Sequence, residues 1–191
     1  MLKSSASFLV LLLGLLGTSL LWASSEKEKA TPERYKAVSV QPKTARLNPA
    51  TQLDILVERF TSDSERMEYA QVLKEKGPEA LLRTLSKINV GRISAPGQVG
   101  VAVAVARVRE TEGGKRVRLV TTRPVSFLQA RRGEISDQYP YTIMDLYLDN
   151  DGKGQGSVVS AIKVFFDDDG QLQLQGLGGN PLDLINVELV K

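Results

Sequence analysis

Polar and hydrophobic residues alternate along most of the chain, and this alternation predicts a protein built mainly of β-strands. In residues 52–60, Leu53, Ile55 and Val57 fall on one face of an extended chain, with acidic residues on the other. A period of two residues is typical of a strand that buries one face. Patterns of this kind predict about eight strands, at 35–41, 52–60, 98–110, 115–123, 141–149, 157–166, 171–175 and 182–190.

The period changes between residues 61 and 88, where apolar residues recur at helical spacing. Ser62 followed by Glu65 predicts a capping box at the start of a helix. Gly77 suits the end of that helix, and Pro78 suits the first turn of a second one. We therefore predict a helical hairpin over about 63–88. Its apolar stripes, which pack on the sheet or else form a groove for a partner, are Met67, Ala70, Leu73, Leu81, Leu82, Leu85 and Ile88.

The strand predicted at 98–110 is apolar on both faces. Val99, Val101, Val103 and Val105 share one face, and small residues occupy the other. This pattern favours a central strand whose small-residue face is covered by the helical hairpin. Antiparallel strands joined by short turns, with the helices grouped in one place, define the α+β class. A largely antiparallel sheet of about eight strands is expected to curl into a sandwich or an incomplete barrel.

The first 25 residues have the pattern of a secretory signal peptide. A start with one lysine precedes an uncharged run from Phe8 to Trp22, which small residues follow. Cleavage after either Ala23 or Ser25 fits this pattern. The alternative is an uncleaved membrane anchor, but a spanning helix needs about 20 apolar residues and this run has 15.

The predicted organisation after the signal peptide is simple. Residues 26–34 are polar and form a flexible linker, and residues 35–191 form a single α+β domain. Without cysteine the chain cannot carry a lipoprotein anchor. We therefore expect an exported protein of the periplasm or the extracellular space that touches the membrane only through the uncleaved signal segment.

The chain contains no cysteine and no histidine, which excludes several kinds of chemistry. A Ser-His-Asp triad, a cysteine nucleophile and a zinc or iron site with His or Cys ligands are impossible. Chemistry by carboxylates, Lys, Tyr, Ser or Arg remains, as does binding of a hard metal ion by oxygen. Because so many catalytic groups are excluded, the sequence favours a protein that is not an enzyme. No cofactor is expected.

Charge is distributed unevenly along the chain. Residues 107–132 contain eight basic residues against two acids, and residues 134–169 contain eight acids against two lysines. Neighbouring strands that neutralise each other across a solvated face are the simpler interpretation, and a basic binding surface is the alternative. The net charge of +3 is too small to indicate a nucleic-acid partner.

Several motifs resemble those of a group of uncharacterised exported bacterial proteins. The resemblance rests on DILVERF, the TSDSER helix start, KGPEALL, TTRP and LYLDNDGKGQG, and it covers nearly all of the chain after the signal peptide. That group usually has an acid before the arginine of TTRP. The resemblance implies a bacterial origin, and it implies no activity and no functional residues.

The stretch DNDGKGQG, residues 149–156, has some features of a calcium loop. Asp149, Asp151 and Gly154 match the first, third and sixth positions of an EF-hand loop. Lys153 at the fifth position cannot ligate, and Ser160 at the twelfth cannot replace the bidentate glutamate. A hairpin turn is therefore favoured, and weak calcium binding by Asp149 and Asp151 stays open. Residues 167–170 (DDDG) likewise predict a hairpin turn, at the opposite end of the intervening strand.

The remaining candidate residues are arginines. Arg131 and Arg132 lie in a long polar loop, and Arg123 lies in the TTRP segment. Arginines in such positions suit a carboxylate or a phosphate, although solvated loop charges are the simpler interpretation. The sequence thus favours a non-catalytic binding or structural protein of the cell envelope with a protein or small-molecule partner. The alternatives are a weak calcium- or anion-binding module and a carboxylate-based hydrolase.

Overall fold

The structure is a computed structural model. It describes residues 31–40, 50–125, 128, 139–167, 169–176 and 181–190. The predicted signal peptide and most of the predicted linker lie outside these residues. In the described part of the chain, no helix is both long enough and apolar enough to cross a membrane.

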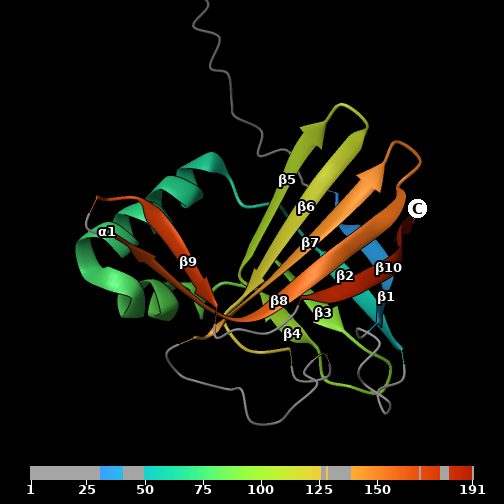
Figure 1. The fold of residues 1–191 in the computed structure, drawn as a ribbon, viewed down its shortest axis with the longest axis horizontal. Coiled ribbons are helices and arrows are strands. Elements are labelled where there is room, and N and C mark those ends of the chain that lie inside the picture. The colour runs from blue at the N-terminus through green and yellow to red at the C-terminus, as the bar shows by residue number, and fades with distance from the viewer. Residues whose placement is uncertain are drawn as a thin grey trace, which may run out of the picture.

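The described residues form a largely antiparallel sheet of ten strands and one helix, arranged as a nearly closed barrel with the helix outside it (Figure 1). The order of the strands around the barrel is β4-β3-β2-β1-β10-β8-β7-β6-β5, and β9 pairs with β8 outside this path. The strands are β1 (Glu33–Val40), β2 (Thr51–Val57), β3 (Gly91–Ser94), β4 (Val101–Val103), β5 (Val105–Thr111), β6 (Gly114–Thr121), β7 (Tyr141–Asp149), β8 (Lys153–Phe166), β9 (Leu172–Gly176) and β10 (Leu182–Val190).

The two ends of the sheet meet at Ala104, where β4 ends and β5 begins. β4 pairs with β3, whereas β5 pairs with β6, so the two ends of the sheet are consecutive pieces of chain. Val103 and Ala106 face the barrel interior, but Ala104 packs in the outer cluster beneath the helix. The predicted single strand with four valines on one face is therefore wrong. The alternation slips by one residue because the chain turns a corner at this position.

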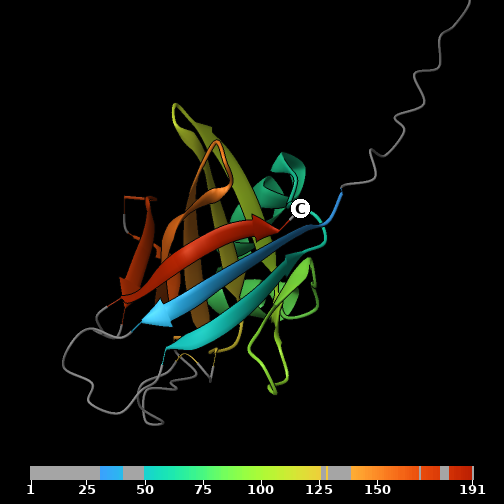
Figure 2. The ribbon, with the colours of Figure 1, turned by 90° about the vertical axis from the view of Figure 1, so that its right-hand side faces the viewer.

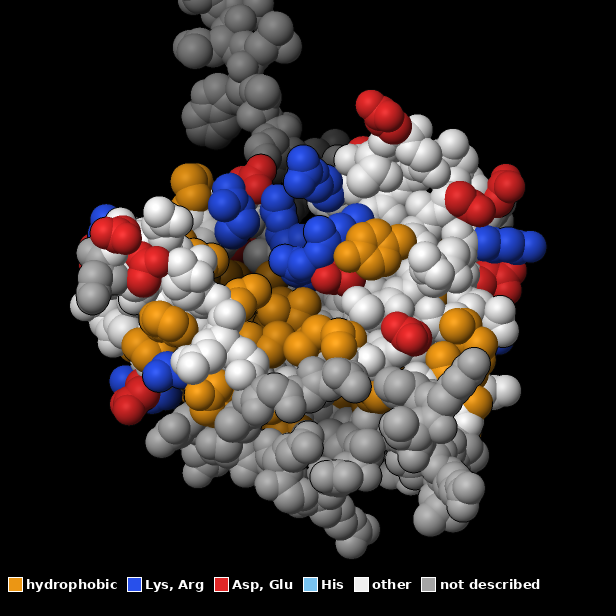
Figure 3. Space-filling view, in the orientation of Figure 1, with side chains coloured by type: hydrophobic (Ala, Val, Ile, Leu, Met, Phe, Trp, Pro, Cys, Tyr) orange, Lys and Arg blue, Asp and Glu red, His pale blue; other side chains and the backbone are white. Residues whose placement is uncertain are grey.

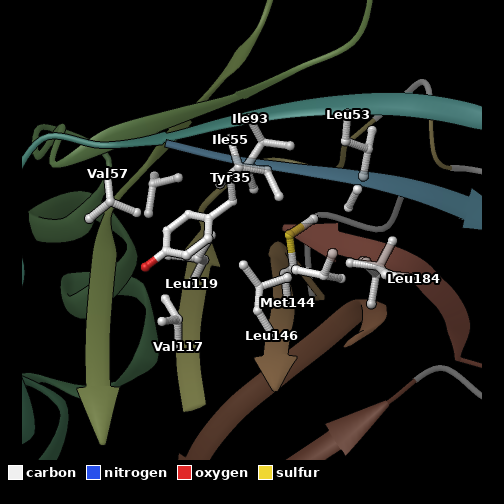
Figure 4. Packing of buried hydrophobic residues seen from close by; sticks show 14 of the residues in the cluster. Tyr35, Leu53, Ile55, Val57, Ile93, Val117, Leu119, Met144, Leu146 and Leu184 are labelled. Atoms are coloured by element: carbon white, nitrogen blue, oxygen red, sulfur yellow. The ribbon is translucent and has the colours of Figure 1, made fainter. Parts of the chain in front are cut away.

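The barrel interior is filled with side chains (Figure 4). Tyr35 and Ile55 enter from one wall, and Leu119, Met144 and Leu184 enter from the others, all of them fully buried. Residues two apart on a strand point to the same side, which is why the alternating segments of the sequence supply this core. The interior is a packed core of the kind that fills small barrels.

The helix α1 (Asp63–Leu85) covers part of the outer wall of the barrel. Its second half buries Leu81 and Leu85 as predicted, and its first half buries Leu73. Tyr69 and Val72 pack beside Leu73, whereas Met67 is exposed, so the predicted stripe of the first half was wrong in part. Tyr141 and Ile143 supply the facing surface of the wall; the other buried members of this outer cluster are Ala104 and Ile162.

The predicted division of the helical segment at Gly77 and Pro78 is confirmed, but its two halves form the single kinked element α1. Gly77 has φ 79° and ψ 178°, a conformation that only glycine adopts readily, and Pro78 starts the second half at once. The capping box at Ser62 and Glu65 is confirmed, since each backbone N–H is accepted by the other's side chain.

The strand count was also too low. The four-residue strand β3 was not predicted, and the segment at 98–110 divides into β4 and β5. The other predicted strands are present, and the ranges 141–149 and 182–190 agree with the bounds of β7 and β10. The predicted α+β class with an incomplete barrel agrees with the structure.

Candidate functional site: an arginine-rich face on β5 and β6

Four arginines stand together on the outer face of two neighbouring strands. Arg107 on β5 lies directly opposite Arg118 on β6, and Arg109 lies opposite Arg116. The two-residue spacing on each strand keeps all four on one side, while the residues between them turn to the interior. We call these four residues the arginine face. Like charges directly opposite each other destabilise a sheet, so this arrangement needs compensation.

Asp145 on β7 compensates the two arginines of β6. Its two carboxylate oxygens accept hydrogen bonds from Arg116, at 3.2 and 2.7 Å, and from Arg118, at 2.8 and 2.9 Å. The side chain of Asp145 is only 11% exposed. This burial alone raises the pKa of its carboxyl, but the hydrogen bonds from Arg118 and Arg116 outweigh burial and hold the pKa below its usual range.

Arg107 takes its partners from the start of the helix. It donates to the backbone oxygen of Thr61 at 2.7 Å and to the carboxylate of Asp63 at 2.8 Å. Arg109 is exposed, and its side chain has no ion pair or hydrogen bond to any residue that the structure describes. Two carboxylates therefore pair with three of the four arginines, and Asp63 is also shared with Arg66 at 3.6 Å. The four arginines keep an excess of two positive charges over these two carboxylates.

An aromatic ring borders the arginine face. Tyr147 on β7 is 45% exposed, and the guanidinium carbon of Arg116 lies 5.3 Å from the centre of its ring. Figure 3 shows the Lys and Arg side chains gathered on this side of the molecule, with a hydrophobic surface directly below them. The face therefore offers planar donors, an unpaired cation and an aromatic edge to a ligand from solvent.

A second ionic group fills one end of the barrel interior. Lys115 lies 2.9 Å from both carboxylate oxygens of Glu33, and the hydroxyl of Tyr35 donates to the same carboxylate. Burial, the hydrogen bond to Glu33 and the charge of Glu33 all raise the pKa of the Tyr35 hydroxyl. A tyrosine with a raised pKa is a poor base or nucleophile. This group therefore closes the end of the barrel and offers little chemistry.

An open pocket lies against the outside of β1 and β2. It has a volume of about 490 Å³ and reaches Pro96 and Asn186. Its charged lining residues Lys36 and Asp54 stand opposite each other in the β1–β2 ladder, and Asp54 also pairs with Arg34 at 3.7 Å. The charges of this pocket are balanced, unlike those of the arginine face.

The predicted calcium ligands lie in the hairpin between β7 and β8, as the turn prediction requires. One carboxylate oxygen of Asp149 accepts the backbone N–H groups of Asp151 and Lys153, each at 2.9 Å. Asp149 thus stabilises the turn itself. Among the described residues no group of three or more acidic side chains is placed to hold a metal ion. Weak calcium binding here remains a prediction that thermal unfolding with and without calcium tests.

The other acidic turn and the predicted arginines lie elsewhere. Asp167 accepts the backbone N–H of Gln171 at 2.7 Å in the β8–β9 turn, at the other end of β8 from Asp149. Arg123 is exposed just after β6 and is not in the arginine face. Arg131 and Arg132 lie outside the described residues, so their anion binding remains a prediction.

Sequence reasoning noted the basic segment at 107–132 but did not single out the arginine face. The signal was present in the spacing, because arginines stand two apart on both sides of the turn at Glu112 and Gly113. Folding that turn into a two-residue hairpin places Arg109 opposite Arg116. The predicted neutralisation between neighbouring strands is present only in part. Asp145 on β7 neutralises charge on β6, whereas the β5–β6 pair places arginines opposite arginines.

The fold and the arginine face define an α+β protein with a barrel-like antiparallel sheet and a basic outer surface. No family model, no curated protein and no solved structure matches this chain.

Proposed function

We propose that the protein is an exported, non-catalytic binding protein of the bacterial cell envelope that holds phosphate-bearing ligands on its arginine face. The signal-peptide pattern and the resemblance to exported bacterial proteins support the location. The excess positive charge of the arginine face supports the kind of ligand. The sequence left an anion-binding role as one alternative, at other arginines; the geometry favours the four on β5 and β6.

The observation that carries the proposal is the direct opposition of Arg107 and Arg118 and of Arg109 and Arg116. Holding four guanidinium groups on two paired strands costs free energy unless anions compensate them. Asp145 and Asp63 compensate only part of this charge. A phosphate group that accepts hydrogen bonds from the planar guanidinium forks supplies the rest, and such charge-assisted bonds are the strong ones.

Binding is favoured over catalysis by how the carboxylates are used. Glu33 is held by Lys115, and Asp145 is held by two arginines. Each carboxylate is thus surrounded by cations and does not face another acid, whereas a glycosidase-type mechanism needs two carboxyl groups flanking one bond. The packed barrel interior supports a ligand site on the outer surface rather than inside.

Titration of the purified protein with inorganic polyphosphate, followed by calorimetry at several salt concentrations, tests the proposal. We expect binding that weakens steeply as salt rises, because salt ions screen the attraction between the phosphates and the arginines. Arg109→Ser should weaken it several-fold without loss of stability, since the side chain of Arg109 has no partner among the described residues. The matched control is Arg34→Ser, which removes the same charge from β1, on another side of the barrel.

The outcomes separate the possible sources of binding. Equal loss in Arg109→Ser and Arg34→Ser would mean a general effect of net charge and would overturn the arginine face as the site. A loss confined to Arg123→Ser would move the site to the segment after β6. Parallel titrations with vesicles of phosphatidylglycerol and of phosphatidylcholine distinguish a lipid phosphate from a soluble one.

A further inference from the structure

β9 is a strand with an unpaired edge. It pairs with the last five residues of β8 and with no other strand in the part of the chain that the structure describes. β8 leaves the barrel wall near Ala161, which has a positive φ of 56°, and its end carries β9 outward. In Figure 2, β9 stands at the left margin of the molecule, outside the barrel. The second edge of β9 is therefore free of any described strand.

The hydrogen-bond pattern of the β8–β9 hairpin fixes which backbone groups face that free edge. The N–H of Asp167 donates to the backbone oxygen of Gln171 at 3.0 Å, and residues 166 and 172 form the next pair. Bonded and non-bonded pairs alternate in an antiparallel ladder, so Gln173 and Gln175 also direct their backbone groups to β8. Leu172 and Leu174 therefore direct theirs outward.

The sequence of this edge lacks the features that normally prevent pairing. Residues 171–175 (QLQLQ) contain no charge and no proline, and Leu172 and Leu174 are 57% and 52% exposed. Edge strands are usually protected by charges, proline or a bulge. The two other end strands differ from β9, because β5 carries Arg109 and Glu110 near its exposed end and β4 has only three residues. β9 is therefore the described strand best suited to accept a further strand.

The residues 171–175 also read the same in both directions. An antiparallel pair of two identical strands has a two-fold axis, and residue i then faces residue j while j faces i. With the axis at Gln173, Leu172 faces the partner's Leu174, and Gln171 faces the partner's Gln175. The outward backbone groups of Leu172 and Leu174 then pair with each other, and no like charges meet. The edge is complementary to itself in shape, polarity and charge.

We infer that two copies of this protein associate through antiparallel pairing of their β9 strands, with the two-fold axis at Gln173. The contact adds one ladder of backbone hydrogen bonds and brings four leucines together on one face of the joined sheet. This contact is much smaller than a standard protein interface, so the dimer forms only as the protein concentration rises. The inference does not depend on the arginine face.

A single-cysteine variant tests the register, because the chain has no cysteine of its own. The axis places residue 173 opposite itself in a non-bonded pair, where the Cα atoms lie about 4.5 Å apart. That spacing permits a disulfide. Gln173→Cys should therefore form a disulfide-linked dimer on mild oxidation. Gln175→Cys is the matched control, since two residues 175 would lie about 13 Å apart at the strand spacing of an antiparallel pair.

Sedimentation of the full-length protein supplies a second measurement. We expect a monomer–dimer equilibrium that the variant Leu172→Lys shifts to monomer, with an unchanged circular dichroism spectrum as the check of folding. Equal cross-linking of Gln173→Cys and Gln175→Cys would overturn the proposed register. A protein that stays monomeric at every concentration, or a dimer that persists in Leu172→Lys, would overturn the interface.

Discussion

Arg107 and Arg118 face each other across the β5–β6 ladder, and each takes its carboxylate from a different neighbour. Arg107 pairs with Asp63 at the start of α1, whereas Arg118 shares Asp145 with Arg116. The arginine face is therefore tied both to the helix and to β7. Its charge and the stability of this wall of the barrel depend on the same two acids.

Replacement of Asp145 by Asn separates these two roles. We expect Asp145→Asn to lower the free energy of unfolding by about 2 kcal/mol, because Arg116 and Arg118 lose charge-assisted hydrogen bonds. The same change should strengthen polyphosphate binding, because the arginine face gains one net positive charge. Urea denaturation and calorimetry measure the two effects, and Asp183→Asn, at an exposed position of β10, is the control. Weaker polyphosphate binding in a folded Asp145→Asn variant would contradict the assignment.

Glu65 makes stability depend on pH in the acid range. The hydrogen bonds from Arg59, at 3.0 and 2.9 Å, lower the pKa of Glu65 from its ordinary 4.5 to about 2. A lowered pKa in the folded state means that the stabilisation is complete above about pH 4.5 and is lost as the pH falls toward 2. Because both side chains are partly exposed, we expect a loss of only about 1 kcal/mol.

The variant Glu65→Gln isolates this contribution. It should remove that part of the pH dependence, so that the difference in unfolding free energy between wild type and variant shrinks as the pH falls from 5 to 2. Urea denaturation at a series of pH values measures it. Glu68→Gln, at an exposed position on the same helix, is the control. A difference that grows on acidification would show that Glu65 is not stabilised by Arg59.

Gly77 holds the kink of α1 in a backbone conformation that other residues avoid. A Cβ atom at this position would meet nothing within 4 Å, so a larger residue has space. We therefore expect Gly77→Ala to destabilise the protein by about 1–3 kcal/mol through backbone strain alone. Thermal unfolding measures the loss, with Lys76→Ala as the control. An unchanged melting temperature would mean that the kink relaxes into a continuous helix.

The hydroxyl of Tyr141 is buried between α1 and the barrel wall, and it has no hydrogen-bond partner among the residues that the structure describes. Burial raises its pKa to about 12, so it stays neutral at physiological pH. An unpaired buried hydroxyl costs free energy, and Tyr141→Phe should therefore raise the stability by about 1 kcal/mol. Urea denaturation tests this, with the exposed Tyr147→Phe as the control. A loss of stability in Tyr141→Phe would show that the hydroxyl is bonded.

The sequence predicted those parts of the fold that depend on local pattern. The ranges of β7 and β10, the capping box at Ser62 and the break at Gly77 follow from residue types within a few positions of one another. The strand β3 was missed because four residues are too few to show a period. The corner at Ala104 was missed because the curvature of the whole sheet, and not the local pattern, requires it.

The arginine face, like the corner at Ala104, could not be predicted from the local sequence pattern alone. A count of charges along the chain places basic residues near acidic ones and suggests that they cancel. Only the register shows that Arg118 faces both Asp145 on one side and Arg107 on the other. Whether charges cancel depends on which strands are neighbours, and that property belongs to the folded sheet.

The packed interior of the barrel has a consequence for how any ligand is exchanged. Tyr35, Met144 and Leu184 occupy the space in which a hollow barrel would bind a ligand. Anything held on the outer wall stays in contact with water and within reach of other molecules, so capture and release need no opening of the fold. Such a protein is suited to presenting a ligand at a surface, and it is poorly suited to shielding one during transport.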